Sequence, residues 1–191
     1  SNFSVGANIG LALYAANIAA WPMIEEMVAS GQKIYKALKY APFPVVAAPS
    51  GMALGGGCEI LLHSDAVQAH AESYIGLVET GVGLVPGWGG CKEMIMRWMA
   101  NKKRPGGPMP AISQTFETIA MAKVAKSAME AKDLLFLRAE DGITMNRDRL
   151  LADAKAKALA LAADYTPPQP ATVSLPGPTA RAALGLAVGE L

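Results

Sequence analysis

Three consecutive glycines, Gly55-Gly56-Gly57, constrain the local fold of this chain more than any other feature of its sequence. An apolar run from Pro44 to Ala48, typical of a strand, precedes them, and Cys58 to Leu62, apolar with a helical period, follows. Each glycine inside a helix would cost about 1 kcal/mol relative to alanine, so we expect a turn between a strand and a helix. Such a turn lets a ligand approach free N–H groups at a helix N-terminus, where the dipole favours an anion.

Two carboxylates accompany this turn. Glu59 lies just inside the expected helix, and Glu79 is the only charged residue between Ser73 and Gly90. The glycines alone are equally compatible with a tight structural turn in which Glu59 merely complements the helix dipole. Glu79 favours a ligand site, because a segment of apolar residues and glycines is a poor place for a carboxylate that is only solvated.

Length and composition exclude several classes of protein. The chain has 191 residues, 52% of them hydrophobic, and a formal charge of +1, which predicts one domain. No basic run is present, so we expect no nucleic-acid partner. The longest apolar stretch, Leu11 to Ile24, contains Asn17 and Pro22 and is shorter than the roughly 20 residues that cross a bilayer. We therefore expect no membrane span.

The cysteines and histidines form no recognisable metal or disulfide motif. Cys58 and Cys91 make no CxxC pair and have no clustered histidines beside them. This favours a reducing, cytoplasmic compartment without a metal site. We expect His63 and His70 to be structural or surface residues.

The first and last parts of the chain have helical patterns. Residues 9–39 predict a helix with Pro22 in a first turn and a buried stripe at Met23, Met27, Ile34 and Leu38. Residues 142–144 read as a short break before a long helix over 147–163, and residues 171–191 read as a tail.

Three blocks resemble the signature of the enoyl-CoA hydratase/isomerase (crotonase) superfamily. They are Phe3-Ser4-Val5-Gly6-Ala7-Asn8-Ile9, then Ala53 to Glu59, and then Glu79 followed by Pro86-Gly87-Trp88-Gly89-Gly90. They occur in the order that the family has. The resemblance covers residues 2 to about 163.

The resemblance implies an α/β fold: a crotonase-like (ClpP/crotonase) spiral of strand-strand-helix turns with a C-terminal helical region. It also implies that the chain is an N-terminally truncated piece of a longer protein. The expected parts are a core fragment over 1–110 with the site, a helical region over 111–165, and a proline-rich tail over 166–191.

The same resemblance assigns roles to individual residues. The N–H groups of Ala7 and Gly56 would form an oxyanion hole for a thioester oxygen, Glu59 would act mainly as base toward water, and Glu79 mainly as acid toward Cα. The remaining expected contacts with substrate are Asn8, Ile9, Gly55, Gly87 and Trp88. Asn8 stands where the family usually has Asp, and the bulky Trp88 leaves the acyl-chain length open.

The implied function is an enoyl-CoA hydratase (a hydro-lyase) that adds water to trans-2-enoyl-CoA in fatty-acid β-oxidation, because hydration uses both carboxylates. The alternatives are an enoyl-CoA isomerase or other crotonase-type enzyme, which can use one carboxylate, and a noncatalytic fragment. A hydrolase built on Ser50, His63 and Asp65 is disfavoured because Ser50 has no nucleophile motif.

The expected partners follow from the same resemblance. Coenzyme A enters only as part of the acyl-CoA substrate. Residues 127–146 and the long insertion after Ile9 resemble the hydratase part of fused 3-hydroxyacyl-CoA dehydrogenase/enoyl-CoA hydratase proteins. We expect no NAD site in this chain, since it has no dinucleotide fingerprint, and NAD only if a parent protein carries a dehydrogenase domain. The chain is expected to meet such a domain or to form a homo-oligomer.

Overall fold

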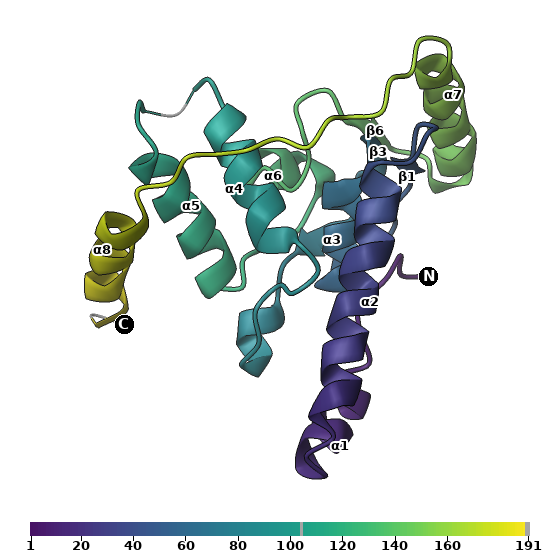
Figure 1. The fold of residues 1–191 in the computed structure, drawn as a ribbon. Helices are drawn as coiled ribbons and strands as arrows, with labels where there is room; N and C mark the ends of the chain where they lie inside the picture. The colour runs from purple at the N-terminus through teal and green to yellow at the C-terminus, as the bar shows by residue number, and fades with distance from the viewer. Residues whose placement is uncertain (104, 190–191) are drawn as a thin grey trace.

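The computed structural model describes residues 1–103 and 105–189, so residues 104, 190 and 191 of the expected core and tail lie outside it. The helices are α1 (Ile9–Asn17), α2 (Trp21–Lys39), α3 (Gly56–His63), α4 (Gly90–Ala100), α5 (Met109–Ala120), α6 (Ala128–Asp133), α7 (Leu150–Ala162) and α8 (Gly177–Gly189), with 3-10 turns η1 (Glu79–Val82) and η2 (Arg147–Arg149). The strands are β1 (Val46–Ala47), β2 (Met52–Leu54), β3 (Ala66–His70), β4 (Tyr74–Gly76), β5 (Val124–Ala125) and β6 (Gly142–Thr144). Figure 1 shows their arrangement.

The strands form two small sheets that the chain visits in turn. One sheet has the order β1-β3-β6 and is parallel, whereas the other has the order β2-β4-β5, with β2 parallel to β4 and β5 antiparallel to β4. The chain passes from β1 to β2, through α3, and then to β3 and β4, adding one strand to each sheet. This path is the strand-strand-helix spiral that the sequence predicts.

The N-terminal segment lies along the free edge of β2. Ser4 pairs with Ala53 in a parallel bridge, the N–H of Leu54 donates to the Ser4 carbonyl, and the N–H of Ser4 donates to the Met52 carbonyl. A Cβ added to Gly57 would lie 2.2 Å from the Ser4 carbonyl oxygen, so only glycine allows this approach. The edge pairing therefore holds the segment after Ser4 beside the glycine turn.

Helix α3 is the centre of the core. It contacts α2, α4 and β2, and Figure 1 shows it behind α2 in the interior of the molecule. Cys58, Leu61 and Leu62 are fully buried on it. The core around them consists of apolar side chains from both sheets, from the residue after β4, from α4 and from the segment after α6: Val67, Ile75, Leu77, Met94, Phe136 and Leu137.

The guanidinium of Arg97 satisfies the carbonyls at the end of α3. It donates to Leu61 and Leu62 of α3 at 3.4 and 3.3 Å, and to Leu135 and Phe136 at 3.2 and 2.8 Å. Burial lowers the pKa of Arg97 to about 10, which leaves it charged at neutral pH. One partly buried cation thus joins α3 to the segment that follows α6.

Removing this cation is expected to destabilise the fold. We expect Arg97→Met to lower the free energy of unfolding by about 3 kcal/mol, because the buried carbonyls lose charge-assisted donors. Urea denaturation of the variant measures this, with Arg181→Met on the exposed face of α8 as the control, expected within about 0.5 kcal/mol of wild type. Equal unfolding midpoints for the two variants would contradict this role.

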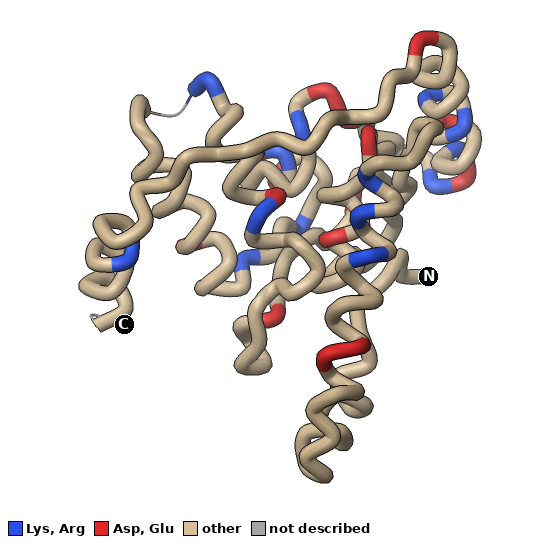
Figure 2. Tube along the Cα trace, in the orientation of Figure 1, with Lys and Arg blue, Asp and Glu red and all other residues tan. Residues whose placement is uncertain are grey.

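The N-terminal helical region differs from the prediction in two respects. It is interrupted after Asn17 and resumes as α2 with Pro22 in its first turn, because Ala19 takes a positive φ of 53°. The buried positions on α2 are Gly31 and Tyr35, so the predicted stripe is wrong at Met23 and Ile34, which are exposed. Figure 2 shows no charge on α1 and places the lysines of α2 toward its C-terminal end.

Two further expectations need correction. Residues 142–144 form β6 rather than a break, since they pair with β3 through Gln68↔Gly142 and His70↔Thr144. The expected tail contains α8, which follows an extended segment that crosses the molecule from α7 to α5 (Figure 1). Both differences depend on pairing between distant segments.

Among the described helices, none has the length and apolar character needed to span a bilayer.

Candidate active site

The loop after Ser4 crosses directly over the N-terminus of α3. Gly6 has a φ of +86°, and a Cβ added to it would lie 2.8 Å from the backbone nitrogen of Gly56. Gly56 is the first residue of α3, and Gly55 before it takes a φ of 54° that favours glycine. Within the described residues, the N–H groups of Ala7 and Gly56 have no hydrogen-bond acceptor. The structure therefore brings two free backbone donors together at the positive end of a helix.

Glu59 is held beneath this turn by backbone N–H groups. Its side chain is almost fully buried, and its Oε1 accepts hydrogen bonds from Trp88 N at 3.0 Å and Gly90 N at 2.8 Å. Burial and, to a smaller extent, the nearby charge of Glu79 raise the pKa of Glu59 to about 7, although the two N–H donors act to lower it. Glu59 can therefore gain or lose a proton near neutral pH.

Glu79 lies on the other side of the turn, at the start of η1. A Cβ added to Gly55 would lie 3.3 Å from Glu79 Oε1, so this carboxylate packs directly against the glycine backbone. Its Oε2 is buried and accepts no hydrogen bond from the described part of the chain. Burial raises the pKa of Glu79. A buried carboxylate oxygen without a partner is costly, and a reacting group or water would satisfy it.

The other residues expected at the site have different positions. The indole of Trp88 lies against Gly56, whereas the Gly87 carbonyl accepts from Gln32 Nε2 at 2.9 Å and so faces α2. The side-chain oxygen of Asn8 accepts from Leu11 N at 3.3 Å and caps α1. Capping needs only an acceptor oxygen, so Asn serves where the family usually has Asp. Ile9 is half exposed at the start of α1.

Sequence reasoning missed Tyr35. Its hydroxyl donates to the Gly56 carbonyl at 2.9 Å, and its ring packs edge-on against Trp88 at a centroid distance of 5.3 Å. Burial raises the pKa of Tyr35, so the phenol stays protonated and donates. Tyr35 lies four residues after Gly31, and these are the two buried positions of α2. The sequence held no signal for this face, because the apolar residues of α2 fit more than one face.

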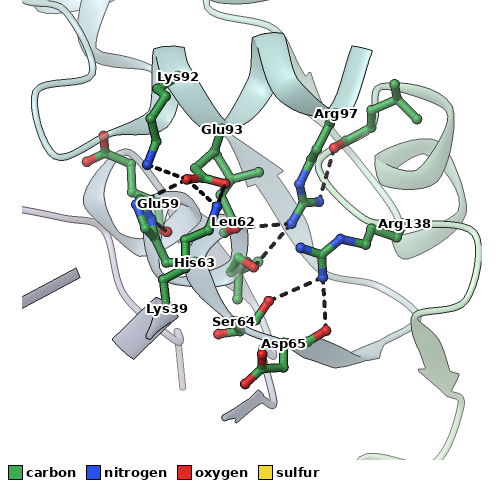
Figure 3. A network of polar contacts seen from close by, with 12 residues as sticks. Lys39, Glu59, Leu62, His63, Ser64, Asp65, Lys92, Glu93, Arg97 and Arg138 are labelled. Atoms are coloured by element: carbon green, nitrogen blue, oxygen red, sulfur yellow. Dashed lines mark hydrogen bonds and ion pairs between the residues drawn. The ribbon is translucent and has the colours of Figure 1, made fainter. Parts of the chain in front are cut away.

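A network of polar contacts around Glu93 lies next to Glu59 (Figure 3). His63 Nδ1 is 2.7 Å from the Glu59 carbonyl, and its Nε2 is 3.7 Å from Glu93 Oε1. Lys39 donates to Glu93 Oε1 at 2.7 Å, and Lys92 lies at the same distance from that oxygen. Burial alone would raise the pKa of Glu93, but these lysines lower it below its usual value. His63, expected to be an ordinary structural or surface residue, joins α3 to α4 in this way.

The described residues contain no group of side chains that resembles a metal site. In residues 1–103 and 105–189, no three His, Cys, Asp or Glu side chains are grouped so that they could hold a metal ion. Cys58 and Cys91 are unlinked thiols. The arrangement places two ionisable carboxylates, Glu59 and Glu79, on either side of the backbone donors of Ala7 and Gly56.

The raised pKa of Glu59 has a consequence for stability. A glutamate with an ordinary pKa of 4.5 loses its proton earlier in the unfolded chain than in the folded one. The free energy of unfolding therefore falls as pH rises from about 4.5 to about 7, by up to about 3 kcal/mol. We expect Glu59→Gln to make this fall smaller and to leave only the part that Glu79 contributes, since burial raises the pKa of Glu79 as well. Urea denaturation near the two pH values measures the difference. An identical pH dependence in the variant would contradict the raised pKa.

Comparison with known proteins identifies the family. The family model for enoyl-CoA hydratase/isomerase matches residues 2–103, more than half of the chain. The chain belongs to this family. A probable 3-hydroxyacyl-CoA dehydrogenase of Bacillus subtilis (strain 168) is 43% identical over all 191 residues, which are 24% of that protein. A crotonyl-CoA hydratase of Syntrophomonas wolfei is 36% identical over 93 residues, 49% of this chain and 34% of the relative.

Solved structures confirm the crotonase-like fold. An enoyl-CoA hydratase from Thermoplasma volcanium superposes with a TM-score of 0.65 at 20% identity, covering 83% of this chain and 56% of that one. An enoyl-CoA hydratase from Bacillus anthracis gives a TM-score of 0.61 at 24% identity, covering 75% and 49%. The chain thus spans about half of these family structures and about a quarter of the Bacillus subtilis relative.

Proposed function

We propose that this chain carries the catalytic site of an enoyl-CoA hydratase that adds water to trans-2-enoyl-CoA thioesters, as in fatty-acid β-oxidation. One observation carries the proposal. Glu59 and Glu79, both with raised pKa values, flank a glycine turn at which the N–H groups of Ala7 and Gly56 are free. Hydration of an enoyl thioester requires these four groups.

The two amides act on the thioester oxygen. Ala7 N–H and Gly56 N–H donate to it as negative charge develops there, and Gly56 adds the positive end of the α3 dipole. A donor of this kind typically contributes about 10²–10³ in rate. Gly6 and Tyr35 serve as positioning residues, because Gly6 brings the loop over Gly56 and Tyr35 holds the Gly56 carbonyl.

The two carboxylates handle the water and the protons. Ionised Glu59 accepts a proton from water while the water oxygen bonds to Cβ, and the electron pair of the double bond moves toward Cα and the thioester oxygen. Protonated Glu79 then gives its proton to Cα. Proton return from Glu59 to Glu79 restores the starting state. The Oε1 of Glu59 is held by Trp88 N and Gly90 N, so Oε2 is the oxygen left to face the water.

An enoyl-CoA isomerase is the second candidate. In the described residues, Glu79 Oε2 is the only carboxylate oxygen of the site that is buried without a hydrogen-bond partner. A single carboxylate suffices to move one proton between two carbon atoms, which is what an isomerase does. Hydration is favoured because Glu59 also has a pKa of about 7 and faces the same turn. The 36% identity to a protein named crotonyl-CoA hydratase supports the same choice.

We propose further that the full-length protein joins this site to a 3-hydroxyacyl-CoA dehydrogenase. The relatives that are 40–43% identical are named 3-hydroxyacyl-CoA dehydrogenase or fatty acid oxidation complex trifunctional enzyme, and this chain covers 14–24% of each. In this proposal NAD binds outside these residues and coenzyme A enters only with the substrate. The protein works in the cytoplasm, with its dehydrogenase domain or a second copy as partner.

The test compares two substrates with the full-length protein. Incubation with crotonyl-CoA should give 3-hydroxybutyryl-CoA, whereas incubation with trans-3-hexenoyl-CoA should give little product, as followed by chromatography and mass spectrometry. If only the 3-enoyl substrate is turned over, the protein is an isomerase and the proposal of a hydratase is wrong. Absence of turnover with both substrates would contradict both activities. Another crotonase-type reaction and the noncatalytic alternative would then remain.

A further inference from the structure

The indole of Trp88 fills the gap between α2 and the N-terminus of α3. A Cβ added to Gly31 of α2 would lie 2.1 Å from its Nε1 and 2.3 Å from its Cε2. A Cβ added to Gly56 of α3 would lie 2.6 Å from its Cζ3 and 2.9 Å from its Cε3. Opposite edges of one ring system therefore press on two glycines, and neither position has room for a side chain while the indole is there.

Several contacts hold the indole in this position. The Tyr35 ring meets it at an interplanar angle of 87°, and the Tyr35 hydroxyl is bonded to the Gly56 carbonyl. Gln32 bonds the carbonyl of Gly87, and the Trp88 N–H bonds Glu59. Tyr35 of α2 thus contacts the indole ring, whereas Gln32 of α2 and Glu59 of α3 bond to the backbone at Gly87 and Trp88. It can leave the gap only if these contacts are lost.

The indole also borders the reacting centre of the proposed hydratase. A thioester oxygen bonded to Gly56 N–H lies about 2.9 Å from that nitrogen. The indole edge lies against the same residue, with Glu79 on the Gly55 side and Glu59 bonded to the Trp88 peptide. A substrate whose thioester oxygen is bonded to Gly56 N–H therefore lies beside the aromatic ring.

We propose that Trp88 closes the acyl end of the site, so that this protein prefers short-chain 2-enoyl-CoA thioesters such as crotonyl-CoA over long-chain ones such as 2-decenoyl-CoA. This inference rests on the proposed hydratase function. Gly31 is the companion residue, because only a position without a side chain on α2 accommodates the indole in this orientation. Trp88 determines specificity by contact with the acyl chain, and Gly31 acts through Trp88.

The first test measures chain-length selectivity in the full-length protein. The ratio of kcat/KM for 2-decenoyl-CoA to that for crotonyl-CoA is determined for wild type, Trp88→Ala and Trp88→Phe. We expect Trp88→Ala to raise this ratio by about 10–100-fold, mainly through a lower KM for the long substrate, and Trp88→Phe to raise it less. The matched control is Val85→Ala on the same loop, whose side chain is 70% exposed. It should leave the ratio unchanged.

The second test uses Gly31→Ala, which should act in the opposite direction. The new Cβ would push the indole toward Gly56, so kcat/KM should fall for both substrates and fall most for 2-decenoyl-CoA. Gly31→Ala touches neither carboxylate, and it keeps the inference testable if Trp88→Ala fails to fold. The role of Trp88 is overturned if wild type hydrates crotonyl-CoA but its ratio of kcat/KM values for the two substrates equals the ratio in Trp88→Ala and in Gly31→Ala. A wild type without turnover of either substrate overturns the hydratase itself.

Discussion

Glu59→Gln and Glu79→Gln are each expected to lower kcat for crotonyl-CoA hydration by about 10²–10⁴-fold. The reason is that the amide can neither accept the proton of water nor donate the proton to Cα in the required form. Glutamine is a fair replacement for Glu59, because its side-chain oxygen can still accept from Trp88 N and Gly90 N. The loss should therefore appear in kcat with the fold intact. Steady-state kinetics and thermal unfolding of the same preparations separate the two effects.

The control for both changes is Glu72→Gln, which removes an exposed carboxylate away from the turn. It should retain the activity of wild type. Activity within about threefold of wild type in either site variant would contradict the two-carboxylate mechanism, since loss of a general acid or base costs at least about a hundredfold. If Glu59→Gln alone retains activity, the result would favour an isomerase that moves a proton with Glu79.

Gly6→Ala is expected to lower kcat by about 10²–10³-fold, the effect of losing one oxyanion donor. The backbone at this position has a φ of +86°, and the new Cβ would meet the nitrogen of Gly56 at 2.8 Å. Because Gly56 N is the rigid first N–H of α3, the loop that carries Ala7 must move away. KM for crotonyl-CoA should change much less than kcat, since the donors act mainly on the transition state.

Gly81→Ala supplies the matched control for this change. It lies in η1, has no atoms within 4 Å of an added Cβ, and is not among the glycines with positive φ. Its kcat should equal that of wild type. The Gly6→Ala variant should also remain folded, with a loss of about 1–3 kcal/mol from backbone strain. A folded Gly6→Ala protein with full kcat would contradict the placement of the oxyanion hole.

The sequence predicted the parts of the site that depend on neighbouring residues. The turn at the glycine run and the first-turn location of Glu59 follow from local patterns of strand, turn and helix. The strand next to the turn is β2, which was not predicted, and Gly56 and Gly57 are already the first two residues of α3. Glu79 was noticeable because no other charge lies near it in the sequence. That Ala7 and Gly56 act together was expected only from the resemblance to the family. The pairing of Ser4 with Ala53, which brings the two residues together, was not predicted, since it joins segments about fifty residues apart.

What the sequence did not predict depends on how distant elements pack. The apolar residues of α2 fit more than one face, and the face that contains Gly31 and Tyr35 is chosen by the indole of Trp88. Strand β6 has only three residues and exists because β3 lies beside it. The polar groups around Glu93 come from α2, α3 and α4, so no local pattern could show that they meet.

The central claim is that this site adds water across the double bond of an enoyl thioester. The most direct measurement incubates the full-length protein with crotonyl-CoA in water enriched in oxygen-18 and analyses the thioesters by mass spectrometry. The account predicts 3-hydroxybutyryl-CoA with the heavy oxygen in its hydroxyl group, at a rate that falls sharply in Glu59→Gln and Glu79→Gln. Recovery of crotonyl-CoA without heavy oxygen or hydroxyl product would contradict it.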